Sequence, residues 1–144
     1  MSDAPVPKSV GRPRVLVSNR QSRPVDESDL ANLAARTLAA EGAGEVELSL
    51  SFVEPQEMED LHIRYMGEPG PTDVLSFPMD GDGLIGDVVV CPQEAAGNNP
   101  DAAQELRLLV VHGVLHLLGY DHEGEDDRRV MWDKQQTYSG VAAP

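Results

Sequence analysis

The chain has 144 residues and a formal charge of -14, from 25 acidic and 11 basic residues. That length fits one domain with a sizeable hydrophobic core, and the negative charge disfavours generic binding to polyanions. The single cysteine, Cys91, excludes an intrachain disulfide and fits a reducing cytosol. No stretch is long and apolar enough for a membrane span, and residues 1–10 lack the apolar core of a secretory signal. We therefore expect a cytoplasmic protein without a membrane segment.

The first residues of the chain combine prolines with positive charge and show no apolar periodicity. We expect residues 1–13 to form a disordered tail and residues 14–140 to form one domain. The domain starts with an apolar stretch at 14–18 that predicts a β-strand. Apolar residues then recur at helical spacing between Asp26 and Leu38, and Gly42 and Gly44 predict the end of that helix. Alternation of polar and apolar residues over 45–52 predicts a strand with one solvated face.

The second half of the chain predicts a β-hairpin between helices. Pro55 ends the preceding strand, residues 56–66 fit a short helix, and residues 67–71 fit a loop. Apolar stretches at 72–78 and 84–91 flank Asp-Gly-Asp-Gly at 80–83, which favours a tight antiparallel turn and lacks the further ligand positions of a calcium loop. A long helix ending near Leu118 follows. A last helix then has the acidic residues within 123–127 at its N-terminus and carries the apolar residues Val130, Met131, Trp132 and Tyr138. We expect an α+β fold, a small mixed β-sheet with an antiparallel edge hairpin packed against helices.

Three histidines, His112, His116 and His122, lie within the sequence V-V-H-G-V-L-H-L-L-G-Y-D-H. Residues four apart on a helix share a face and lie roughly 6 Å apart, so His112 and His116 can bind one ion. Gly119 can adopt the left-handed conformation that ends a helix, which lets the chain bring His122 to the same ion. Three neutral imidazoles around zinc leave a fourth position for water, the pattern of a catalytic site. We therefore predict one zinc ion per chain.

An alternative interpretation treats His112 and His116 as core histidines with hydrogen-bond partners, and His122 as a turn residue. The helix is apolar on nearly all sides, which indicates burial. Imidazole nitrogens buried there without partners would cost about 1 to 3 kcal/mol each, and a metal ion supplies the partner. Ligand type, number and spacing together favour the metal.

A zinc site of this kind lowers the pKa of bound water to near neutrality, which provides a nucleophile for hydrolysis of an ester, amide or phosphodiester. The three histidines and Gly119 match the metalloprotease pattern H-E-x-x-H-x-x-G-x-x-H except at Gly113, where the protease has the glutamate that serves as general base. A peptidase with this sequence would need a substitute base. A zinc metalloprotease-like hydrolase is therefore the second hypothesis.

The string H-G-V-L-H-L-L-G-Y-D-H, with P-T-D-V-L-S-F-P at 71–78 and G-D-V-V-V at 86–90, resembles the YbeY family of bacterial endoribonucleases. The resemblance implies a zincin-like α+β fold, zinc held by His112, His116 and His122, and cytoplasmic hydrolysis of single-stranded RNA in small-subunit ribosomal RNA maturation and ribosome quality control. It implies ribosomal RNA and the small ribosomal subunit or its assembly proteins as partners. Family members commonly carry an arginine directly after the tyrosine that precedes the P-T-D loop, whereas Met66 stands at that position here.

Four further residues are candidates for catalysis beside the metal. Asp121, just before His122, can orient a ligand imidazole or act as a base, or it can simply form a turn. Ser76 and Asp87 lie in the two hairpin strands, which we expect to border the metal, although a strand aspartate can equally bind backbone amides. Arg64 can replace the family's arginine only if its side chain reaches the same place, since adjacent helical positions point roughly 100° apart.

The remaining aromatic, histidine and cysteine side chains fit structural positions. Tyr65 and Phe77 can stack on an RNA base but are more simply core residues, and His62 fits the surface of a short helix. Cys91 fits a small buried side chain better than a nucleophile.

An RNA enzyme of this acidic charge needs a local cationic groove or a basic ribosomal partner. A ribosome-assembly factor with a mainly structural zinc is the third hypothesis. A fourth protein ligand would favour that role, and an exchangeable water would favour the enzyme.

Overall fold

The computed structural model describes residues 12–79, 83–121 and 123–141. The expected tail, residues 1–13, therefore lies almost wholly outside the described residues. Within them the chain forms four strands and five helices, in the order β1 (Arg14–Arg20), α1 (Glu27–Ala40), β2 (Glu47–Val53), α2 (Pro55–Met66), β3 (Val74–Pro78), β4 (Leu84–Val90), α3 (Pro92–Asn98), α4 (Ala102–Leu117) and α5 (Glu125–Ser139). None of these helices is long and apolar enough to cross a membrane.

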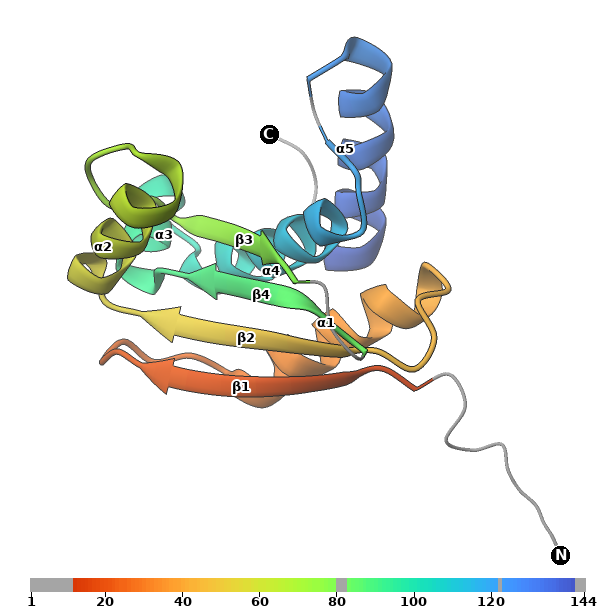
Figure 1. Ribbon diagram of the computed structural model, residues 1–144, viewed down its shortest axis with the longest axis horizontal. Helices are drawn as coiled ribbons and strands as arrows, with labels where there is room; N and C mark the ends of the chain where they lie inside the picture. Colours follow the sequence, from red (N-terminus) through yellow and green to blue (C-terminus); the bar gives the residue numbers. More distant parts are fainter. Residues whose placement is uncertain (1–11, 80–82, 122, 142–144) are drawn as a thin grey trace, which may run out of the picture.

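The strands form a mixed sheet in the order β1-β2-β4-β3 (Figure 1). β1, β2 and β4 run parallel, and β3 runs antiparallel to β4 at the edge. The expected mixed sheet and its antiparallel edge are confirmed, while residues 80–82 of the predicted turn lie outside the described residues. Parallel neighbours need long crossover connections, which α1 supplies between β1 and β2.

Helices α1 and α4 cover one face of the sheet (Figure 1). Alternate side chains of a strand point to opposite faces, so every second residue of β2 and β4 faces these helices. The resulting core is almost inaccessible to solvent and includes Leu33, Leu38, Leu48, Leu50, Phe52, Val88, Val90, Val110 and Val114.

α4 approaches the sheet closely at Gly113. A Cβ built on Gly113 would lie 2.6 Å from Cγ1 of Val88, so only glycine fits this contact. A second close contact involves Gly86 of β4, where a Cβ would lie 2.8 Å from Cδ2 of Leu117 and 2.5 Å from the backbone oxygen of Phe77. These two contacts fix the depth and the rotation of α4, and hence the position of its histidines relative to β3 and β4.

α2 packs against the other face of the sheet, over a second and smaller core made of Val53, Met58, Leu75, Val89 and Cys91. Cys91 is fully buried, as predicted, and burial raises the pKa of its thiol. His62 is only partly at the predicted surface position, since 15% of its side chain is exposed. Its Nδ1 lies 2.9 Å from the carbonyl oxygen of Gly70 and its Nε2 lies 3.1 Å from Oε1 of Glu68, so His62 ties the following loop to α2.

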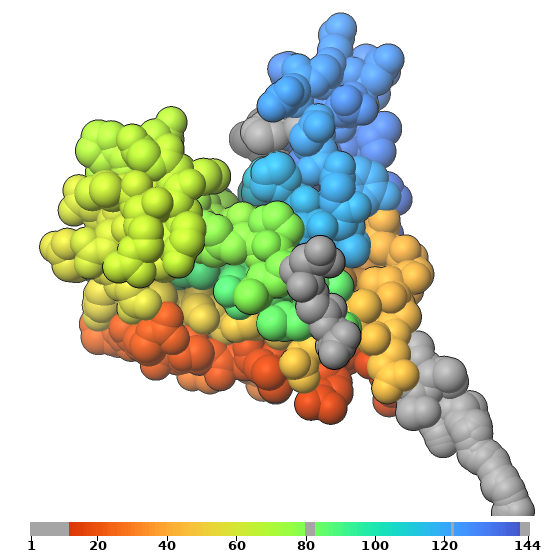
Figure 2. All heavy atoms as spheres, in the orientation of Figure 1, coloured from red at the N-terminus to blue at the C-terminus, as the bar shows by residue number. Residues whose placement is uncertain are grey.

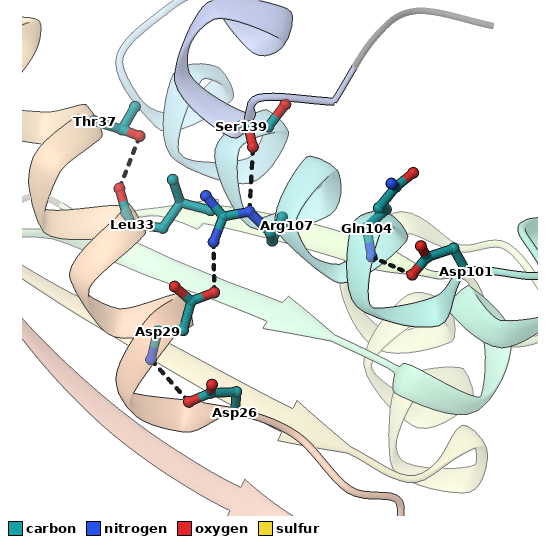
Figure 3. A network of polar contacts seen from close by, with 8 residues as sticks. All are labelled: Asp26, Asp29, Leu33, Thr37, Asp101, Gln104, Arg107 and Ser139. Atoms are coloured by element: carbon teal, nitrogen blue, oxygen red, sulfur yellow. Dashed lines mark hydrogen bonds and ion pairs between the residues drawn. The ribbon is translucent and has the colours of Figure 1, made fainter.

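Arg107 joins the three helices α1, α4 and α5 (Figure 3). Its Nη1 donates to the carboxylate of Asp29 on α1, and its Nε donates to the carbonyl oxygen of Ser139, at 3.2 Å, at the end of α5. Figure 3 also shows the caps that start α1 and α4, where Asp26 and Asp101 each accept a hydrogen bond from the backbone three residues on. The C-terminal helix is thereby held beside the helix that carries the histidines.

Two features of the fold differ from the sequence expectations. The helix α3 was not expected, because seven residues containing Gly97 are too few to show helical periodicity. The predicted apolar residues of the last helix are divided between two environments. Met131 is buried, whereas Val130 and Trp132 are 46% and 44% exposed. The acidic first turn of α5 is confirmed.

Candidate active site

His112 and His116 lie on neighbouring turns of α4, with ring centroids 6.0 Å apart. The predicted pairing on one helix face is therefore confirmed. The helix ends at Leu117, and Gly119 takes the predicted left-handed conformation with φ 103°. The backbone N–H of Tyr120 returns to the carbonyl oxygen of Leu115 at 3.1 Å, so the chain turns back at this point.

Each of the two imidazoles is held through its Nδ1 atom by a carbonyl oxygen. His112 Nδ1 lies 2.6 Å from Oε1 of Gln135 on α5, and His116 Nδ1 lies 3.0 Å from the backbone oxygen of Tyr120. A carbonyl oxygen only accepts, so in the neutral rings Nδ1 carries the proton and Nε2 is the nitrogen with the lone pair. This tautomer and this support are typical of histidines that bind a metal through Nε2.

The turn that supports His116 is itself held by Glu41, at the end of α1. The Glu41 carboxylate accepts hydrogen bonds from the hydroxyls of Tyr120 and Tyr138 and, at 2.9 Å, from Nζ of Lys134. Only 9% of the Glu41 side chain is exposed. Burial raises the pKa of the Glu41 carboxyl, but the three hydrogen bonds and the lysine charge outweigh burial and hold the pKa below its usual value. The same bonds raise the pKa of Tyr120 and of Tyr138.

Other candidate residues occupy different places. Ser76 of β3 lies beside the histidine helix, where its hydroxyl donates to the carbonyl oxygen of Gly113 at 3.1 Å. Asp121 forms a turn, because its Oδ1 accepts from the backbone N–H of Glu123 at 3.2 Å. Arg64 lies at the end of α2, with its guanidinium carbon 6.0 Å from the ring centroid of Tyr65.

Asp87 is not brought to the histidines. Its neighbours Gly86 and Val88 face α4, so its own side chain points to the opposite face of the sheet. There it lines a cavity of about 640 Å³ together with Arg20, Ser49, Ser51, Glu57, Leu61, Tyr65, Met66, Ser76, Phe77, Pro78, Met79 and Val89. Met66 lines this cavity and Arg64 does not, so the cation at the cavity wall is Arg20 of β1.

Over the described residues there is no group of three or more histidine, cysteine or acidic side chains placed to hold a metal ion. His112 and His116 form a pair, and the third predicted ligand, His122, lies outside the described residues. The two described imidazoles are compatible with zinc, since each is held through Nδ1 and both lie on one face of α4.

Sequence reasoning missed the residues that support the imidazoles. Glu41 lies 71 residues or more before the two histidines, and Gln135 lies on another helix. Neither residue belongs to a motif. The alternation over 45–52 predicted a solvated face for this strand. On that face Ser49 and Ser51 line the cavity, and Ser51 is buried.

The space-filling view shows a notch beside the edge of the sheet. In Figure 2 the residues of α2 stand on one side, the residues after α4 and those of α5 stand on the other, and β3 lies between them. The histidine helix and the cavity thus lie on the two faces of the same edge strand.

A family model described as Endoribonuclease YbeY matches residues 16–140. Similar proteins that bear this name include one from Beutenbergia cavernae, 46% identical over 136 residues, which cover 83% of this chain and 91% of the relative. Another is from Thermobifida fusca, 46% identical over 135 residues, which cover 83% of this chain and 87% of the relative.

The solution structure of TM1509 from Thermotoga maritima is similar in fold, with a TM-score of 0.58 and 29% identity over 87% of this chain and 86% of that one. The matched region contains the described histidines, their supports and the cavity on the other face of the sheet. The chain therefore belongs to the YbeY endoribonuclease family.

Proposed function

We propose that this chain is a zinc-dependent endoribonuclease that hydrolyses single-stranded RNA, with His112, His116 and His122 as ligands of one zinc ion. The observation that carries the proposal is the pair of Nδ1 contacts, which presents Nε2 of both described imidazoles from one helix face. The family match supports RNA as the substrate. Within this proposal, the α+β fold is of the zincin-like kind, with the histidine helix packed under a sheet that has an antiparallel edge strand.

A bound zinc ion would supply a Lewis acid and lower the pKa of water near neutrality. The residues of the chain orient the ligands and shape the site. Gln135 and the carbonyl of Tyr120 hold the imidazole protons at Nδ1, and Ser76 joins β3 to α4 at Gly113. Asp121 remains our candidate for the base, because its turn leads directly to His122.

The peptidase alternative is disfavoured by the packing at Gly113. A Cβ there would lie 2.6 Å from Val88, so this position faces the sheet and has no room for the glutamate of the metalloprotease pattern. A general base carried at this position is therefore incompatible with the way α4 packs.

The acidic charge of the chain makes a basic partner part of the proposal. A protein of charge -14 gains little from unspecific contact with phosphates, so we infer that ribosomal RNA is presented by the small ribosomal subunit or its assembly proteins in the cytoplasm. We propose that the protein acts there in small-subunit ribosomal RNA maturation and quality control. An assembly factor with a structural zinc would instead require a fourth protein ligand.

The test compares zinc-loaded wild-type protein with His116→Ala and His62→Ala on single-stranded RNA and on a peptide. His62 is the matched control, since it is a histidine that ties a loop to α2. We expect RNA cleavage by the wild type and by His62→Ala, none by His116→Ala, and an intact peptide throughout. Folded His116→Ala protein that cuts RNA at the wild-type rate would contradict the proposal, and cleavage of the peptide alone would favour the protease.

A further inference from the structure

The cavity on the α2 side of the sheet has a polar floor built from neighbouring strands. Ser49 of β2 and Phe77 of β3 are the register partners of Asp87 on either side, so these three side chains form a row across the sheet. Ser51 lies one step further along β2, beside Val89. This arrangement places one carboxylate and two hydroxyls at the base of a cavity of about 640 Å³, a volume that suits a small-molecule fragment such as a nucleotide.

The polar groups of this floor are poorly satisfied by the chain itself. Ser51 is buried, with 8% of the residue exposed, and no other described residue forms a hydrogen bond with its hydroxyl. Asp87 is half-buried at the cavity, and its carboxylate likewise has no hydrogen bond to another described residue. Buried polar groups are rarely left without partners in native proteins. The ionised carboxylate only accepts, so the missing partner is a group that donates hydrogen bonds.

The walls of the cavity favour a flat, neutral ligand. Tyr65 is 58% exposed, which corrects its assignment to the core, and its ring lies 5.0 Å from that of Phe77. Exposed aromatic rings of this kind stack on nucleic-acid bases. Glu57 compensates the charge of Arg20 through contacts of 2.7 and 3.3 Å. The carboxylate of Asp87 therefore gives the cavity a net negative charge, which excludes a phosphate.

We propose that this cavity binds a guanine base of the RNA substrate. The guanine edge carries an N1–H and an N2 amino group side by side, and these two donors match the two oxygens of Asp87. Adenine and cytosine place an acceptor nitrogen beside their amino group, and uracil places its single N–H between two carbonyls, so each would set a lone pair against the carboxylate. The proposal rests on the proposed function, since it names the base preference of an RNA enzyme.

The edge strand connects this cavity to the histidines. Ser76 lines the cavity and also donates its hydroxyl to the carbonyl oxygen of Gly113 on α4, next to His112. The side chain of the following residue, Phe77, points to the cavity face of the sheet. β3 has no further strand beside it in the described sheet. A single strand of RNA that crosses this edge places a base in the cavity while a neighbouring phosphodiester lies on the histidine side.

The experiment measures binding of labelled, nuclease-resistant 2′-O-methyl oligonucleotides to the zinc-loaded full chain by fluorescence anisotropy. The oligonucleotides are uridine-rich and differ at one position, which holds guanine, inosine, adenine or cytosine. We expect guanine to bind about 10-fold more tightly than adenine, as for other bidentate contacts between a side chain and a base. Inosine, which lacks the N2 amino group, should fall between them.

The decisive variant is Asp87→Asn, which has the same shape but one acceptor and one donor. It should lose the guanine preference, because adenine and cytosine each place an amino donor beside an acceptor nitrogen, which complements the asparagine amide. Glu45→Gln is the matched control, since it removes one negative charge from an exposed residue that does not line the cavity. A second variant, Tyr65→Leu, should weaken binding of all four oligonucleotides by a similar factor because it removes stacking alone.

Equal affinity for all four bases, or a ranking unchanged by Asp87→Asn in folded protein, would overturn the proposal. If Asp87→Asn instead weakens binding of a labelled oligolysine peptide and leaves the base ranking unchanged, the cavity takes a cationic side chain and the proposal is wrong. RNA cleavage without base discrimination would leave the proposed function intact and remove only the guanine site. Base discrimination without RNA cleavage would support the guanine site and contradict the proposed function.

Discussion

Gln135 offers a direct test of how α5 supports the proposed metal site. Its side chain is buried, with 8% of the residue exposed, and its Oε1 lies 2.6 Å from Nδ1 of His112. Gln135→Leu keeps the size of the side chain but removes the acceptor, so Nδ1–H loses this partner in a low-dielectric place. Loss of such a partner costs about 1 to 3 kcal/mol. Residues that orient a metal-binding histidine contribute about 10- to 100-fold to metal affinity, which is about 1.4 to 2.7 kcal/mol and agrees with that range.

The measurement is the zinc dissociation constant, obtained by competition with a chromophoric chelator. We expect Gln135→Leu to raise the constant about 10- to 100-fold. The neighbouring Gln136→Leu is the matched control, because Gln136 is exposed on the same helix and its substitution should leave the constant unchanged. Gln135→Glu retains an acceptor and should bind zinc at least as tightly as the wild type. Folded Gln135→Leu protein with wild-type zinc affinity would refute the argument that this contact orients His112.

Three further predictions concern stability and reactivity. The pKa of Glu41 is lowered in the folded state, so its carboxylate stabilises the fold above the usual carboxyl pKa and loses this effect as pH falls through the folded pKa. Thermal unfolding should therefore show Glu41→Gln to be less stable than wild type by about 1.5 to 3 kcal/mol at pH 7. The difference in stability should shrink in acid. Gly113→Ala should lower stability by about 1 to 3 kcal/mol in urea titrations, because its Cβ meets Val88, and an unchanged midpoint would contradict the packing described. Cys91, fully buried and with a raised pKa, should react with a thiol reagent only after unfolding.

The histidine helix could be predicted from the sequence because its signals are local. Four-residue spacing places His112 and His116 on one face, and Gly119 marks the end of the helix; the structure reproduces both features. The antiparallel edge was predictable for the same reason, since two apolar stretches flank a short turn sequence. In each case, residues within one turn or one hairpin determine the outcome.

The supports of the site could not be predicted, because they depend on how distant elements dock. Glu41 reaches Tyr120 and Tyr138 across 79 and 97 residues, and no local pattern marks this contact. The side of the sheet on which Asp87 lies depends on the register of β4 against α4, which the close contact at Gly86 decides. We expected Asp87 to border the metal because it lies in a hairpin strand, but a strand has two faces and the neighbours of Asp87 occupy the one that meets α4.

The two imidazoles are held by elements from both ends of the domain, so the proposed metal binding would be linked to the docking of α5. His112 depends on Gln135 of α5, and His116 depends on a turn held by Glu41 of α1, which Lys134 and Tyr138 of α5 also bind. α5 otherwise buries few side chains, namely Met131, Gln135 and Ser139. A ligand that binds only the native arrangement stabilises that arrangement in proportion to its affinity. Zinc that requires both imidazoles in place would therefore stabilise the docked α5, and a helix with so little apolar burial has most to gain from it.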